Sequence, residues 1–168
     1  MDVILLMATT LDGMIARDSS QLVDWSGKAD KQYFVKVTRE AGVMIMGSRT
    51  YDTIGHPLPG RLNIVMTRDK SRKSNDENLV FTDEPPSVIL KDLEKKGYDK
   101  VALIGGAIIN SMYARENLIT HVHITLVPRF FGKGLSLFTD ELDTNLVLSE
   151  YREIAKGHLL LIYEVKHE

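Results

Sequence analysis

The chain has 168 residues, 43% hydrophobic and 26% charged, which suits one globular domain spanning residues 1–168 and argues against disorder. Its formal net charge of −2 argues against broad affinity for nucleic acids or membrane surfaces. The absence of cysteine excludes disulfides, thiolate zinc sites and cysteine nucleophiles.

The first part of the chain alternates between strand and helix patterns. Residues 3–8 form a continuous apolar run, typical of a strand covered on both faces and too short to cross a membrane. We therefore expect a cytoplasmic protein. The irregular stretch 9–27 follows, and loops of that length are usually functional or mobile. The next elements that we predict are helix 29–41, strand 43–46, helix 48–54, strand 62–66 and a polar loop at 67–77.

The second part continues the alternation and ends in a hairpin. The predicted elements are strand 79–81, a helix from 86 to about 96, strand 101–104, helix 107–115, strand 121–127 and hairpin strands 147–154 and 158–165. The pattern predicts a three-layer α/β fold. Its central, mostly parallel mixed sheet has about eight strands, ends in a C-terminal antiparallel hairpin and is flanked by about four helices. Ligands of such sheets bind beyond the carboxyl ends of the strands, which here are followed by loops starting at Thr9, Gly47, Thr67 and Gly105.

Two of these loops contain glycine next to a predicted helix. Gly105 and Gly106 stand between a buried strand and a helix, where the backbone can approach a phosphate and the free N–H groups of the helix can bind it. A tight turn that needs positive φ is the alternative, because the three-glycine fingerprint is incomplete.

Cationic and hydroxyl side chains follow two neighbouring strands. Ser48, Arg49 and Thr50 open a helix after Gly47, and Thr67 and Arg68 follow the next strand. Arginines at two strand ends suit a dinucleotide with an additional 2′-phosphate, which a guanidinium grips with two hydrogen bonds. The alternatives are that Ser48 is an ordinary helix N-cap and that the basic run 70–73 is only solvated.

Asp30 lies on an apolar helix face that it shares with Phe34, Val37 and Ala41. Burying a carboxylate there is costly unless it has a partner or a task, such as binding a protonatable heterocycle. The alternative is an acidic residue in the first helical turn that the helix dipole favours. His121 and His123 share one strand face and could bind a metal, but without a third ligand nearby we expect a surface or core role and no metal site.

The order of these motifs resembles the dihydrofolate reductase family. The segment MGSRTYDTIGHPLPGRLNIVMTR at 46–68 is similar to a characteristic segment of that family, in which the run PLPGRxN is especially distinctive. TTLDGMIA at 9–16, the spacing of Trp25, Asp30 and Phe34, and IGG at 104–106 occur in the family's order. The resemblance covers nearly the whole chain and implies reduction of 7,8-dihydrofolate to 5,6,7,8-tetrahydrofolate by hydride transfer from NADPH.

The resemblance also implies roles for individual residues. Asp30 would promote protonation of the substrate, Thr125 would support its carboxylate through a hydrogen bond, and Trp25 would help to place an ordered water. Arg61 would bind the α-carboxylate of the glutamate tail of folate. For Phe34, Ile54 and Leu58 plain core packing is an alternative to ligand contact. The other implied substrate contacts are Leu6, Ala8 and Ile104.

For the cofactor, the resemblance implies a larger set of contacts and a mobile lid at 9–27. Members of the family also carry a cis peptide between the two glycines. The implied cofactor residues are Ala8, Ile15, Gly47, Ser48, Arg49, Thr50, Met66, Thr67, Arg68, Ile104, Gly105, Gly106, Ala107 and Ile108.

Two segments depart from typical folate enzymes. LDGMIA at 11–16 and LVPRFFGKGLSLF at 126–138 are closer to the reductase domain of bacterial riboflavin biosynthesis. The alternative substrate is therefore a ribosylated aminopyrimidine or another pterin-like heterocycle, and a third reading is a non-catalytic NADPH-binding relative. A glutamate tail needs Arg61, whereas a ribitol phosphate would want more cations. We expect a small-molecule substrate, no nucleic-acid or membrane partner, and a monomer, with a homodimer as the alternative.

Overall fold

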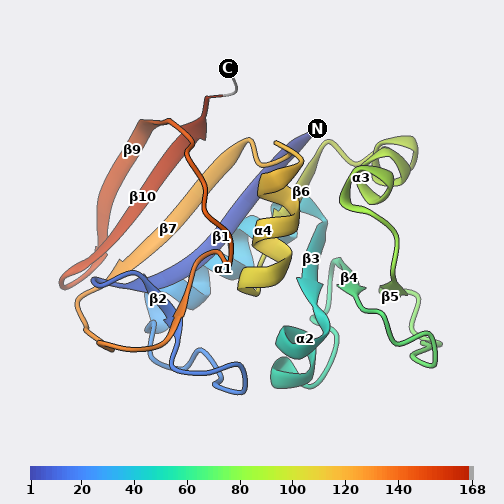
Figure 1. Cartoon of the computed structure of the whole chain (residues 1–168), viewed down its shortest axis with the longest axis horizontal. Coiled ribbons are helices and arrows are strands. Elements are labelled where there is room, and N and C mark those ends of the chain that lie inside the picture. Colours follow the sequence, from blue (N-terminus) through green and yellow to red (C-terminus); the bar gives the residue numbers. More distant parts are fainter. Residues whose placement is uncertain (167–168) are drawn as a thin grey trace.

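The computed structural model describes residues 1–166 and contains one large sheet with helices on both faces (Figure 1). Its eight strands are β1 Asp2–Thr10, β3 Val43–Gly47, β4 Leu62–Met66, β5 Leu79–Thr82, β6 Lys100–Leu103, β7 His121–Val127, β9 Leu146–Ala155 and β10 His158–Val165. Their order across the sheet is β5-β4-β3-β6-β1-β7-β10-β9. Neighbours from β5 to β7 are parallel, whereas β10 is antiparallel to both β7 and β9. The predicted mixed sheet with a C-terminal hairpin is confirmed.

The described residues form four helices, and these pack in pairs on opposite faces of the sheet. They are α1 Lys28–Ala41, α2 Ser48–Ile54, α3 Pro86–Lys95 and α4 Ala107–Arg115. α1 and α2 contribute Val37, Ala41 and Ile54 to one core cluster. α3 and α4 contribute Leu93 and Tyr113 to the cluster on the other face. The predicted three layers are therefore present.

Local sequence explains where these elements begin and end. Every residue of β3 is buried, as expected for a continuous apolar strand in the middle of a covered sheet. Gly42 ends α1 with a φ of 74°, a left-handed conformation that other residues adopt at a cost. Pro86 begins α3, where the N–H that proline lacks would have no intrahelical partner.

The stretch 9–27 differs from the irregular loop that we predict. β1 continues to Thr10, and β2 (Met14–Ala16) pairs with β8 (Leu135–Ser136) in a separate two-stranded sheet. Gly134 lies so close to the carbonyl oxygen of Ala16 that a side chain there would displace the strand. A strand of three residues carries no readable periodicity, and its partner is remote in the sequence.

Within residues 1–166, none of the helices combines the length and apolar character that crossing a membrane requires.

Candidate active site

The loops at the carboxyl ends of β3 and β6 meet directly, because these two strands are neighbours in the sheet. The N–H of Gly47 donates to the carbonyl oxygen of Gly105 at 2.8 Å. The peptide between Gly105 and Gly106 is cis, and Gly105 has a φ of 96°. The structure thus brings together two of the glycine motifs that the sequence singled out, and the tight turn weighed as an alternative is present as well.

The surroundings of these glycines explain why side chains are absent there. A Cβ on Gly47 would lie 2.9 Å from Cγ1 of Ile109, and one on Gly105, which also has positive φ, would lie 3.1 Å from Cε of Met7. α4 begins at Ala107 with no side chain capping its first N–H groups, which therefore stay available to a phosphate. Next to them, Oδ1 of Asn110 is buried without a hydrogen-bond partner. The free N–H groups of α4 and the backbone of the glycines fit a pyrophosphate lying across the two loops, whereas Oδ1 of Asn110 is an acceptor and needs a donor such as a water.

The hydroxyl and cationic residues expected beside these loops differ in whether another residue of the chain already binds them. Ser48 is not the N-cap of α2, since that position is Gly47 and no side chain caps the helix. Arg49 and Arg68 are exposed, and neither forms an ion pair within residues 1–166. Both remain available to a phosphate. Arg72, by contrast, is committed to an ion pair with Asp52.

Asp30 lies half-buried in the first turn of α1. No residue in the described part of the chain forms a hydrogen bond or ion pair with its carboxylate. Thr125 of β7 is 1% exposed and stands opposite Ala8 of β1. The direct hydrogen bond from Thr125 to Asp30 that the resemblance implies is not formed in this structure. The carboxylate therefore keeps its acceptor capacity for a ligand.

Five of the apolar residues expected to contact substrate belong to one core cluster, namely Leu6, Phe34, Ile54, Leu58 and Ile104. Phe34, Ile54 and Leu58 are half-buried at its edge, so they can serve the core and a ligand together. Leu6, Ile104 and Met66 are buried, with exposures of 6%, 7% and 6%. Ile15 of β2 is buried as well, whereas Ile108 on α4 is 55% exposed.

Arg61 is buried, with 5% of its surface exposed. Its Nη1 donates to the carbonyl oxygen of Pro59 at 2.9 Å, and its Nε has no partner. Burial, followed by the charge of Arg39, lowers the pKa of Arg61. No carboxylate within residues 1–166 pairs with Arg61. A buried guanidinium beside a second arginine, with an open donor, is well suited to an anionic ligand group.

The turn that holds Arg61 depends on Asn63, which sequence reasoning missed as a functional residue. Asn63 is fully buried, and its Oδ1 accepts the N–H of Leu58 at 2.9 Å. Its Nδ2 donates to the carbonyl oxygens of Leu58 and Arg61 at 2.9 Å and of Asn78 at 3.1 Å. The sequence did contain a signal for this role, because Asn63 is the last residue of the distinctive run PLPGRLN.

Trp25 packs against a residue from a distant loop. Its ring meets Phe131 edge-on, with centroids 5.1 Å apart and planes at 71°. The guanidinium of Arg17 lies over the ring of Phe131, 4.2 Å from its centroid. Nε1 of Trp25 is buried without a protein partner, which fits a role in holding a water or ligand.

His121 and His123 lie on the face of the sheet that α1 covers, opposite Ile4 and Leu6. Nδ1 of His121 is 2.9 Å from Oγ1 of Thr120, and Nδ1 of His123 is 2.8 Å from the hydroxyl of Tyr33. Both therefore have local hydrogen-bond partners. Residues 1–166 contain no group of three or more side chains that could hold a metal ion.

Both the sequence and the structure of this chain are similar to those of known proteins. A family model described as dihydrofolate reductase matches residues 2–155. The dihydrofolate reductase of Haemophilus influenzae is 33% identical over 111 residues, covering 65% of this chain and 62% of that protein. That of Lactococcus lactis is 29% identical over 138 residues, covering 78% and 79%. The solved structure of Acinetobacter baumannii RibD has a TM-score of 0.87 at 17% identity, over 99% of this chain and 58% of that one. This last likeness concerns the fold.

Proposed function

The chain belongs to the dihydrofolate reductase family, and on that premise we propose that it reduces 7,8-dihydrofolate to 5,6,7,8-tetrahydrofolate with NADPH. The observation that carries the folate assignment is Arg61, which is buried and has an unpartnered Nε. A buried guanidinium without a partner lowers the stability of the fold unless a ligand anion pairs with it, and the glutamate tail of folate provides a carboxylate.

In this proposal the chain contributes the electrostatics of the reaction. NADPH, when bound, supplies the hydride. Asp30 accepts hydrogen bonds from the amidine-like edge of the pterin, and its negative charge favours protonation of the ring nitrogen next to the carbon that receives hydride. Trp25 helps to hold a water in the closed site, whereas support of that carboxylate by Thr125 would need a hydrogen bond that forms only when the ligand is bound. Because hydride transfer to a protonated C=N bond is easier, Asp30 is the residue on which turnover depends.

The cofactor residues fit the same proposal. Gly47, Gly105 and Gly106 allow the backbone to approach the pyrophosphate, and the open N–H groups of α4 bind it. Arg49, Thr67 and Arg68 would hold the adenosine 2′-phosphate. Ala8 and Ile15 line the nicotinamide under the segment 9–27.

A riboflavin-pathway aminopyrimidine is the second candidate substrate. The fold similarity to RibD and the motifs in segments 11–16 and 126–138 favour it. Arg39 is a second cation beside Arg61 and suits the phosphate of such a substrate, so the turnover of each molecule decides between the two candidates. A non-catalytic NADPH-binding role is the third candidate, which the presence of Asp30 disfavours.

The test is NADPH oxidation followed with dihydrofolate and, separately, with the ribosylated aminopyrimidine. We expect Asp30→Asn to lose at least about a hundredfold in turnover at neutral pH while it still binds NADPH. Arg61→Ala should weaken dihydrofolate binding about tenfold or more, with a smaller effect on kcat. Asp24→Asn, which removes an exposed carboxylate before α1, is the matched control and should behave as the wild type.

The possible results separate the three candidates. Tight NADPH binding without dihydrofolate turnover, together with aminopyrimidine turnover, would replace the folate assignment by the second candidate. NADPH binding with turnover of neither substrate would favour the third.

A further inference from the structure

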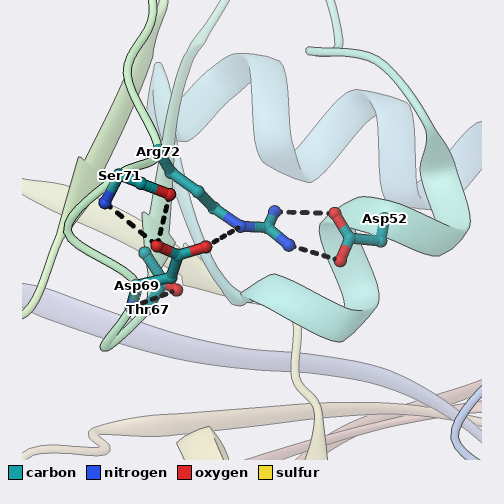
Figure 2. A network of polar contacts seen from close by, with 5 residues as sticks. All are labelled: Asp52, Thr67, Asp69, Ser71 and Arg72. Carbon is teal, nitrogen blue, oxygen red and sulfur yellow. Dashed lines mark hydrogen bonds and ion pairs between the residues drawn. The ribbon is translucent and has the colours of Figure 1, made fainter.

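An ion pair ties α2 to the loop that follows β4. Nη1 and Nη2 of Arg72 each lie 2.7 Å from a different carboxylate oxygen of Asp52, which makes the contact bidentate. Figure 2 shows the two side chains reaching toward each other across the space between helix and loop. The side chain of Arg72 is only 27% exposed, and its hydrogen bonds lower the pKa of Asp52. Bidentate geometry and partial burial make this pair stronger than an ordinary surface contact.

The loop at 67–72 is itself shaped by short-range hydrogen bonds around Asp69. Oγ1 of Thr67 accepts the N–H of Asp69 at 3.1 Å. Oδ1 of Asp69 accepts the N–H and the hydroxyl of Ser71 at 2.9 and 2.6 Å. Nε of Arg72 lies 3.9 Å from the other oxygen of Asp69 (Figure 2). These contacts give the loop a fixed shape, and Arg72 fixes that shape against α2.

An aromatic pair supports Arg72 from one side. Its guanidinium lies 5.8 Å from the ring centroid of Phe81 on β5. Phe81 in turn meets Tyr51 of α2 edge-on, with centroids 5.5 Å apart. The ion pair therefore joins α2 to the 67–72 loop, and the aromatic pair joins α2 to β5, the strand that follows this loop.

Arg72 also balances the negative charges of this region. It takes up the charge of Asp52 and faces Asp69, while Arg49 on α2 and Arg68 in the loop stay free of ion pairs within residues 1–166. Two arginines on separate elements can grip one phosphate only if the distance between the elements is fixed.

We propose that Asp52 and Arg72 are positioning residues that set the spacing between α2 and the 67–72 loop and so give the protein its preference for NADPH over NADH. This inference rests on the proposed function, because it concerns the residues proposed to bind the 2′-phosphate. Neither Asp52 nor Arg72 touches the cofactor in this proposal. They act through Arg49, Thr67 and Arg68.

A double-mutant cycle tests the proposal through cofactor affinity. The dissociation constants of NADPH and NADH are measured by fluorescence titration for the wild type, Asp52→Ala, Arg72→Ala and the double variant. We expect each single variant to lose about five- to tenfold of the NADPH preference, with NADH affinity nearly unchanged. The double variant should lose no more than either single variant, because each residue acts only through the other.

Other results would overturn the proposal in recognisable ways. Equal weakening of NADPH and NADH would mean a purely structural role. Opposite effects of the two single variants that cancel in the double variant would mean a simple charge effect. A wild type that binds neither dinucleotide would overturn the proposed function together with this inference.

A second readout does not need the cofactor. Amide hydrogen exchange at Ser71 and Arg72 should be faster in both single variants than in the wild type, and unchanged exchange would contradict a positioning role. Lys70→Ala is the matched control, because Lys70 lies in the same loop but pairs with Asp83 at 3.2 Å and not with α2. It should change the NADPH preference by less than about twofold.

Discussion

The carboxylate of Asp12 accepts the N–H of Gly132 at 2.6 Å and thereby joins the segment 9–27 to the loop after β7. It also accepts the N–H of Phe131 at 3.2 Å and the hydroxyl of Thr10. The bond from Thr10 is the main reason why the pKa of Asp12 is lowered. The carboxylate is therefore ionised above its ordinary pKa, and the junction is lost only as the pH falls through the lowered value.

Replacing Asp12 by alanine should loosen this junction. Because Phe131 and Gly132 lose their acceptor, we expect faster amide hydrogen exchange there. On our proposal that the segment 9–27 covers the nicotinamide, we also expect a lower kcat/KM, because a segment that is less often closed excludes water less well. The wild-type junction should be insensitive to pH between about 5 and 8. Asp18→Ala is the control, because the carboxylate of Asp18 binds Ser20 within the same loop. Exchange at Gly132 as slow as in the wild type would contradict the prediction.

Sequence predicted the main sheet well and the Asp12 junction not at all. Strand 62–66 and helices 48–54 and 107–115 coincide with β4, α2 and α4 because their apolar patterns and their glycine and proline signals are local. The acceptor role of Asp12 depends on backbone N–H groups more than a hundred residues away, as the sequence separations of 119 and 120 show. No local pattern in TTLDGMIA encodes that contact.

Phe131→Ala should change the emission of Trp25, which is the only tryptophan of the chain. Removing the ring that meets Trp25 edge-on admits water to the indole, so we expect a red-shifted emission maximum. Phe130→Ala is a matched control, since Phe130 is the preceding residue and is 70% exposed. Equal spectra for Phe131→Ala and the wild type would show that this contact does not shield Trp25 in solution.

Arg61→Met should stabilise the fold and weaken substrate binding. Methionine fills a similar volume without a buried charge, so the midpoint of thermal unfolding should rise by about 2–4 °C. Dihydrofolate binding should weaken because the proposed carboxylate partner is gone. The comparison is Arg39→Met, which removes an exposed guanidinium and relieves only its repulsion with Arg61, so the midpoint should rise by less. A lower midpoint for Arg61→Met would mean that its bond to Pro59 outweighs the cost of burial.

The candidate site shows a similar division between what the sequence reveals and what it does not. The strand–glycine–helix motifs predicted that the loops at Gly47 and Gly105 lie at the same ligand-binding edge of the sheet, and in the structure these two glycines are hydrogen-bonded to each other. Whether a basic side chain faces a ligand could not be predicted from the run 70–73. Arg72 pairs with Asp52 and Lys70 with Asp83, and these partners come from other elements.

His123 should make stability depend on pH in a defined direction. Burial, followed by the charge of His121, lowers the pKa of His123 to about 4, while burial raises that of Tyr33 to about 12. The hydroxyl of Tyr33 therefore stays protonated, and it forms a hydrogen bond of 2.8 Å with Nδ1 of the neutral ring of His123. The native state resists a second proton on this ring.

The unfolded chain accepts that proton at the ordinary histidine pKa of about 6.5, so the unfolded state binds more protons than the native state between about pH 6.5 and 4. The contribution of His123 is complete above this window and is lost as the pH falls through it. His123→Gln should therefore lose less unfolding free energy than the wild type between about pH 7 and 5, as measured by urea unfolding. His56→Gln, at an exposed position, should follow the wild type. A constant difference between wild type and His123→Gln across this range would show that His123 titrates alike in both states.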